Sequence, residues 1–192
     1  ELFSGRPNPL VQTSVTLAGA LYVGIGVGGL YGVHDYFYAH AAVTHAPEAI
    51  ASVGQIAGYF TITMLASIWI CDSAAYFVGR AIGRHKIAPS VSPNKSWEGG
   101  VAGVVGAIAA WFAAKAFLPD LAGVSTVTLI AMGVISGVFG QVGDFAESML
   151  KRDAGVKDSS TLIPGHGGVL DRFDTILFCL PAAFYLLWYF VF

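Results

Sequence analysis

The chain has 192 residues and a formal net charge of −2, and 55% of its residues are hydrophobic while only 11% are charged. This charged fraction is less than half of the roughly 25% usual in soluble domains, so the composition excludes an ordinary soluble protein and indicates a membrane protein. Two cysteines, Cys71 and Cys179, are too few for a disulfide framework. We also expect no nucleic-acid partner.

Five uncharged, largely apolar runs follow one another along the chain, at residues 7–33, 49–71, 99–114, 121–143 and 175–192. Each is near or above the ~17–20 residues that a helix needs to span the hydrocarbon core, and snorkelling of Lys115 extends the third run. We therefore predict an all-α, polytopic membrane protein of about five transmembrane helices. We expect residues 1–192 to form one transmembrane domain, and we expect the chain to be a fragment that lacks further helices upstream.

Glycines in the first run match G-x-G-x-x-G at residues 24–29, but the match lies inside a spanning run with no preceding strand. It therefore does not indicate a dinucleotide site. The four-residue spacing of Gly24, Gly28 and Gly32 instead predicts close helix packing, as does that of Gly133 and Gly137. Such small-residue faces also allow a homodimer.

The second run continues as a helix beyond its apolar part, because Asp72, Tyr76, Gly79 and Gly83 keep helical spacing. An acid at the end of an apolar run is costly unless it is paired or hydrated, so Asp72 is a candidate functional residue. Arg80, two turns further along, is a candidate partner for it.

The segment between the second and third runs ends in a polar stretch. Pro89 and Pro93 stop any helix there, and Asn94 or Ser96 can cap the next one. Lys95 either binds a phosphate or snorkels beside an interfacial Trp97, and the spacing leaves both readings open.

Charged residues concentrate in residues 144–174. Helical spacing places Asp144, Glu147, Ser148 and Lys151 on one face, which can bind phosphate and metal together. Further along, the cations are Lys151, Arg152, Lys157 and Arg172, and the acids are Asp153, Asp158, Asp171 and Asp174.

Asp171 and Asp174 point the same way if the last helix begins near Val169. Together with Asp144 they supply hard oxygen ligands suited to Mg²⁺, although acids at a helix start also stabilise the helix dipole. Glycines around His166 let the backbone approach a phosphate, whereas an ordinary Pro-Gly turn is the simpler explanation. His166 itself is open between a phosphate donor, a general acid and a loop-packing residue.

Lys and Arg residues are unevenly distributed between the apolar runs. Of the ten, only Lys115 falls on the far side when five helices cross alternately. The positive-inside rule makes the other face cytoplasmic. We therefore expect an integral protein of the plasma (inner) membrane whose polar site faces the cytoplasm.

Residues 148–174, SMLKRDAGVKDSSTLIPGHGGVLDRFD, resemble the signature of phosphatidate cytidylyltransferases, also called CDP-diacylglycerol synthases, without a departure from its pattern. Residues 72–80 and 92–99 are similar to two further family blocks, except that Asn94 and Ser96 stand where Lys and Thr are expected. The resemblance covers about residues 70–174 and corresponds to the C-terminal, catalytic part of a usually longer family.

The resemblance implies transfer of CMP from CTP to phosphatidate within the lipid bilayer, giving CDP-diacylglycerol and pyrophosphate for phospholipid synthesis. It implies Mg²⁺ as cofactor and leaves room for a second cation. The implied catalytic residues are Asp144, Lys151, Arg152, Lys157, Asp158, His166, Asp171, Arg172 and Asp174, with Asp144, Asp171 and Asp174 as metal ligands. The implied substrate-binding residues are Asp72, Lys95, Ser96, Glu98, Ser148, Gly167 and Gly168.

Two other functions remain as alternatives. One is a different CTP-dependent membrane lipid enzyme, such as a CDP-archaeol synthase or a polyprenol kinase. The other is an ion transporter, which would favour ionisable groups near helix centres and inverted repeats. The acids of this chain collect instead at the cytoplasmic helix ends, and no internal repeat is visible.

Overall fold

The computed structural model describes residues 8–43, 50–89, 91–160, 168 and 170–190. Its elements are α1 (Pro9–Val43), α2 (Ile50–Ile82), β1 (Lys86–Ala88), β2 (Ser92–Ser96), α3 (Trp97–Phe117), η2 (Pro119–Leu121), α4 (Thr126–Val134), η3 (Ile135–Phe139), α5 (Gly140–Asp153) and α6 (Leu170–Phe190). Five helical spans in these residues are long and apolar enough to cross a membrane, with α4, η3 and α5 forming one span, Thr126–Asp153. The predicted all-α class and the number of spans are confirmed.

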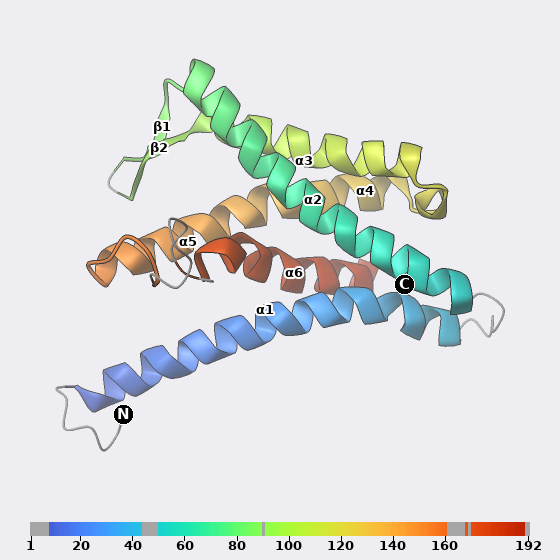
Figure 1. Cartoon of the computed structure of the whole chain (residues 1–192), viewed down its shortest axis with the longest axis horizontal. Helices are drawn as coiled ribbons and strands as arrows, with labels where there is room; N and C mark the ends of the chain where they lie inside the picture. The colour runs from blue at the N-terminus through green and yellow to red at the C-terminus, as the bar shows by residue number, and fades with distance from the viewer. Residues whose placement is uncertain (1–7, 44–49, 90, 161–167, 169, 191–192) are drawn as a thin grey trace.

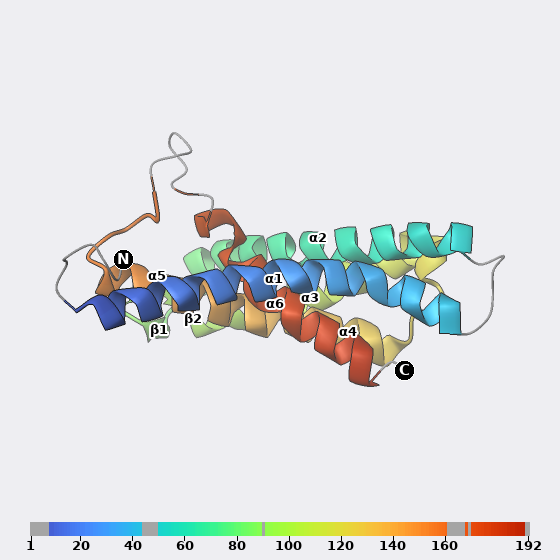
Figure 2. The same cartoon turned by 90° about the horizontal axis from the view of Figure 1, so that it is seen from below.

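The helices run between two ends of the molecule (Figure 1). One end holds the start of α1, the β1–β2 hairpin, the end of α5 and the start of α6. The other holds the end of α1, the start of α2 and the α3–α4 turn. Figure 2 shows the same grouping from a second side. Every described Lys and Arg except Lys115 belongs to a segment at the hairpin end, as the topology prediction requires.

The core lies where α2, α3, α4 and α6 meet. Phe60 of α2 and Trp111 of α3 are buried there, with ring centroids 4.6 Å apart. Leu129 of α4 and Leu180 of α6 belong to the same buried cluster. In the most apolar 18-residue stretch of Thr126–Asp153, 50% of the residues are buried, whereas 6% are buried in the corresponding stretch of α1. The α4–α5 span is therefore central and α1 is peripheral.

Glycines permit two close helix crossings. A Cβ on Gly133 or Gly137 would lie 2.6 or 2.7 Å from the Cα of Ile108 or Val104 in α3, which confirms that predicted pair. On α1, a Cβ at Gly26 or Gly29 would collide with α6.

The prediction for Gly24 and Gly28 was wrong for the described structure, because no atom lies within 4 Å of a Cβ built at either position. Of the predicted set on α1, only Gly32 packs closely, against Phe184. The four-residue spacing indicates a small-residue face but does not identify the face that meets a neighbour.

A short hairpin was not predicted. β1 and β2 pair antiparallel, with Lys86 opposite Ser96 and Ala88 opposite Ser92. The helix that precedes it ends at Ile82, before Pro89, and Ser96 caps α3 by accepting a hydrogen bond from the Gly99 amide at 3.3 Å. The prediction of Ser96 as a cap is thus confirmed, and the hairpin holds Lys95 next to the start of α3.

The central span is not α-helical throughout. Residues Ile135–Phe139 form a π-helical turn between α4 and α5. Such turns free backbone carbonyls from the regular ladder and are frequent at functional sites. Here the π-helical turn separates the apolar half of the span from its charged half.

Candidate active site

Lys151 links the two helices that carry most of the charged segment. Its Nζ forms ion pairs with Glu147, one turn earlier on α5, and with Asp171 Oδ1 on α6 at 2.8 Å. The side chains of Glu147 and Asp171 are only 4% and 8% exposed. Removing one partner of such a buried pair is strongly destabilising, so Lys151 fixes α5 against the start of α6.

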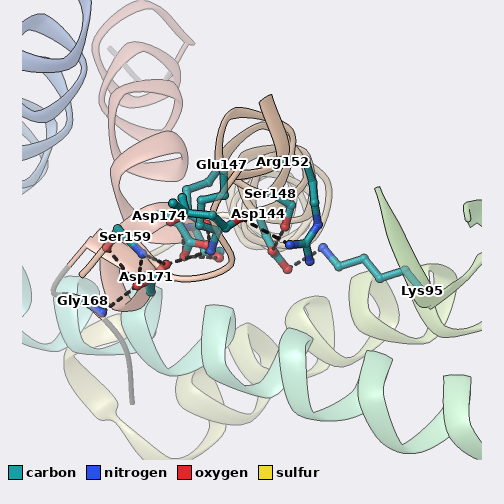
Figure 3. A network of polar contacts seen from close by, with 12 residues as sticks. Lys95, Asp144, Glu147, Ser148, Arg152, Ser159, Gly168, Asp171 and Asp174 are labelled. Atoms are coloured by element: carbon teal, nitrogen blue, oxygen red, sulfur yellow. Dashed lines mark hydrogen bonds and ion pairs between the residues drawn. The ribbon is translucent and has the colours of Figure 1, made fainter. Parts of the chain in front are cut away.

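Asp171 also organises the backbone around the start of α6. Its Oδ2 accepts hydrogen bonds from the Ser159 amide at 2.9 Å, the Ser159 hydroxyl at 2.8 Å and the Gly168 amide at 2.6 Å. Figure 3 shows these residues gathered around the carboxylate. Asp171 is therefore satisfied by protein groups in this conformation.

Asp144 lies on the neighbouring face of α5 and pairs with Lys95 of β2. The Ser148 hydroxyl donates to Asp144 Oδ1 at 3.4 Å, and Lys95 Nζ lies 4.1 Å from the centre of the Phe145 ring. The structure thus assigns Lys95 a specific partner, which the spacing alone left open. Figure 3 shows Lys95 reaching towards α5 from the side opposite to Asp171.

Three acids at this end of the bundle come from three different helices. Asp72 of α2 and Asp144 of α5 line the same cavity, and Asp174 lies on α6. Asp174 is buried, and its Oδ1 accepts a hydrogen bond from the Thr175 amide at 2.6 Å. A buried carboxylate such as that of Asp174 is costly unless it is hydrogen-bonded or paired, which favours a cation near it.

A cavity of about 740 Å³ opens between α2, α3, the hairpin and α5. This volume is within the ~300–1,000 Å³ typical of small-ligand pockets. Its polar lining includes Asp72, Tyr76, Arg80, Lys86, Asn94, Lys95, Ser96, Gln141 and Asp144. Five of the sequence-based candidates, including Ser148 through its bond to Asp144, therefore lie in or beside one cavity.

Glu98 lies outside this cavity, and Arg80, which lines it, has a partner other than Asp72. Glu98 accepts a hydrogen bond from the backbone amide of His85, and one of its carboxylate oxygens lies 2.7 Å from His85 Nδ1. Arg80 Nη1 donates to the Tyr76 hydroxyl at 3.0 Å, and Asp72 is not among its ion-pair partners in the described part of the chain.

The remaining cations lie at the surface. Arg152, Lys157 and Arg172 are exposed, as is Asp158 in the segment after α5. Arg152 Nη1 donates to the Val156 carbonyl at 3.4 Å. His166 and Gly167 lie outside the described residues, whereas Gly168 contacts Asp171 through its backbone amide.

Gln141 is a cavity residue that the sequence analysis missed. It stands three residues before Asp144, so helical periodicity places it near the same face, and it is a polar side chain inside an otherwise apolar run. That combination was the signal by which it could have been found.

The predicted metal ligands are only partly brought together. Among the described residues no three His, Cys, Asp or Glu side chains form a ready cluster for a metal ion. Asp171 is engaged by Lys151, Ser159 and Gly168, while Asp144 pairs with Lys95 and Asp174 accepts a hydrogen bond from the Thr175 amide. Carboxylates are nevertheless the donors that Mg²⁺ prefers, so the donor chemistry at this position fits it.

The model of the cytidylyltransferase family matches residues 2–190. The chain belongs to the cytidylyltransferase family. Among its curated relatives is the phosphatidate cytidylyltransferase of Bacillus subtilis, 47% identical over 122 residues, which are 62% of this chain and 44% of that protein.

Two further relatives of the same name have comparable similarity. The protein of Haemophilus influenzae is 48% identical over 59% of this chain and 40% of its own length. That of Staphylococcus saprophyticus is 42% identical over 59% of this chain and 43% of its own length. The matches thus span less than half the length of these cytidylyltransferases.

Proposed function

We propose that this chain is the catalytic part of a phosphatidate cytidylyltransferase, which transfers CMP from CTP to phosphatidate. One observation carries the proposal. The chain is a member of the cytidylyltransferase family, and Asp144 of α5 pairs with Lys95 in a cavity that Asp72 of α2 also lines. Lys151 of α5 pairs with Asp171 of α6 at the same end of the bundle. The relatives bearing that name match 59–62% of the chain.

In the proposed reaction, a phosphate oxygen of phosphatidate attacks the α-phosphorus of CTP. A new P–O bond forms, the bond to the β-phosphate breaks, and pyrophosphate leaves. The attacking phosphomonoester has a second pKa of about 6 and is mostly dianionic at neutral pH. It therefore needs no dedicated general base, and the barrier lies in bringing two polyanions together.

The cationic side chains of this chain address that barrier. Lys95 projects into the cavity, where Arg80 and Lys86 also line the wall, so this cavity suits the triphosphate. Lys151 lies between α5 and α6, where Glu147 and Asp171 hold its ammonium group in place. We assign Lys151 to the lipid phosphate or to the α-phosphate, with exposed Arg152 beside it.

We propose Mg²⁺ as the cofactor, with a second cation as an option. Asp144 and Asp174 would hold it, and Asp72, which lines the same cavity as Asp144, is a further carboxylate nearby. Asp171 positions Lys151 in the conformation described. When bound, the ion would neutralise charge on the phosphates during transfer.

The hairpin end of the bundle would face the cytoplasm of the plasma membrane. The asymmetry of Lys and Arg supports this orientation, because loops rich in these residues lie on the cytoplasmic side. In this orientation the cavity receives CTP directly from the cytoplasm. The diacyl chains would stay in the bilayer beside the helices. A homodimer through the open glycine face of α1 remains a further prediction.

The proposal is tested by pyrophosphate release from CTP by the complete membrane protein in vesicles. We expect release only when both phosphatidate and Mg²⁺ are present. Release that is independent of phosphatidate, or no release under any of these conditions, would contradict the proposal.

A further inference from the structure

We propose that Gln141 reads the base of the nucleotide, with its side-chain oxygen held as a fixed acceptor for the 4-amino group of cytosine. This inference rests on the proposed function, in which CTP is the nucleotide. It assigns base selection to the wall of the cavity formed by α3 and α5.

The side-chain amide of Gln141 is held in one orientation. Its Nε2 donates to the carbonyl of Gly137 at 2.8 Å and to that of Gly100 at 3.0 Å, and lies 3.8 Å from Cys71 Sγ. An amide nitrogen has two hydrogens, and two carbonyl acceptors use both of them. A flipped amide would place Oε1 against two carbonyl oxygens and leave all three acceptors without a donor, so the flip is disfavoured.

The π-helical turn contributes one of these acceptors. Gly137 lies within Ile135–Phe139, and its carbonyl accepts from Gln141 four residues later. Gly100 lies on α3, so the amide also joins the two helices on either side of the cavity wall. The orientation of the amide is therefore set by backbone groups.

Oε1 is left without a donor on a side chain that lines the cavity. It accepts no hydrogen bond from any residue in the described parts of the chain, and it is not among the buried oxygens. Both Gln141 and Gly100 line the cavity, and a Cβ on Gly100 would lie 2.9 Å from Oε1. The glycine thus leaves the space in which this oxygen is presented.

A fixed acceptor selects a ligand that carries a donor. Cytosine offers the hydrogens of its 4-amino group, whereas uracil presents a carbonyl oxygen at the same position, which would face Oε1 without a hydrogen. Arg80, Lys86 and Lys95 line the same cavity and supply the charge that phosphates require. The cavity therefore combines a base-selective acceptor with a polyphosphate site.

The test is the ratio of kcat/KM for CTP to that for UTP, measured with phosphatidate on the complete membrane enzyme. The variants are Gln141→Leu, which removes the acceptor, and Gly100→Ala, which pushes a methyl group against it. Met149→Leu, at an exposed apolar position of the same helix, is the control. The ratio does not depend on the fraction of folded protein, so partial misfolding does not disturb it.

We expect both variants to lower the ratio at least about 10-fold, because a site built to bond a substrate amino group discriminates through that bond. The KM for phosphatidate and the ratio of the control should stay at wild-type values. An unchanged ratio in both variants would overturn the assignment of Gln141 and would leave the proposed function standing. Loss of turnover with both nucleotides in both variants would show a purely structural role and overturn it as well. A wild-type enzyme that labels no lipid from CTP would end the proposed function and this inference with it.

Discussion

Lys151 Nζ lies 2.8 Å from Asp171 Oδ1, and this ion pair joins the charged end of α5 to the first turn of α6. Asp171 holds the Ser159 and Gly168 amides at the same time, so one carboxylate fixes a lysine and the backbone beside it. In this geometry Asp171 holds Lys151 in position, and its role as a metal ligand stays a prediction.

Asp171→Asn should abolish or severely reduce transfer, because it removes the charge that holds Lys151 and turns one acceptor oxygen into a donor facing amide donors. The cost in unfolding free energy should be on the order of 1–3 kcal/mol. Transfer assays and thermal unfolding in detergent measure both effects. Asp153→Asn, at an exposed acid of the same segment, is the control and should leave both unchanged. Full activity of Asp171→Asn would rule out this role.

Asp144→Asn and Asp174→Asn should raise the Mg²⁺ concentration that gives half-maximal transfer by about 10-fold or more, because each removes a carboxylate from the proposed cation site. Metal titration of activity is the measurement. An unchanged Mg²⁺ requirement in both variants would refute the assignment of these two acids.

Lys95→Gln should raise the KM for CTP and lower kcat/KM, because it removes a cation from the cavity and leaves Asp144 without its ion-pair partner. Lys115→Gln is the matched control at the opposite end of the bundle, where Lys115 bonds the Val124 carbonyl. We expect the control to retain activity within about twofold of wild type. A loss of activity in Lys115→Gln would contradict the proposed topology.

The helix packing offers a prediction that does not depend on catalysis. Gly137→Ala should destabilise the bundle by about 1–3 kcal/mol, because its Cβ would lie 2.7 Å from the Val104 Cα. Gly28→Ala, where the space is open, should not destabilise it. Thermal unfolding in the same detergent compares the two. Equal stability of both variants would show that the α3 contact is not close in solution.

Much of this arrangement could be predicted from local sequence. Apolar length determined the five spans, and helical periodicity placed Asp144 beside Ser148 and Glu147 beside Lys151. The Ser96 cap follows from its hydroxyl at the start of an apolar run. These features depend on interactions within one element, so a single sequence is sufficient to predict them.

Other features depend on how elements meet, and local patterns do not determine them. Pro89 and Pro93 predict the end of a helix but not the pairing of the residues around them into a hairpin. The partner of Asp171 depends on how α6 packs against α5. The orientation of Gln141 depends on a carbonyl of α3 and on a π-helical turn that the apolar pattern does not reveal.

The most direct test of the account is the position of a radioactive label transferred from CTP to lipid by the complete membrane protein, separated by thin-layer chromatography. The proposed chemistry predicts that label on the α-phosphate or on cytidine appears on the lipid when phosphatidate is supplied, and that γ-phosphate label leaves as pyrophosphate. Label from the γ-phosphate on the lipid would instead show a kinase and contradict the account.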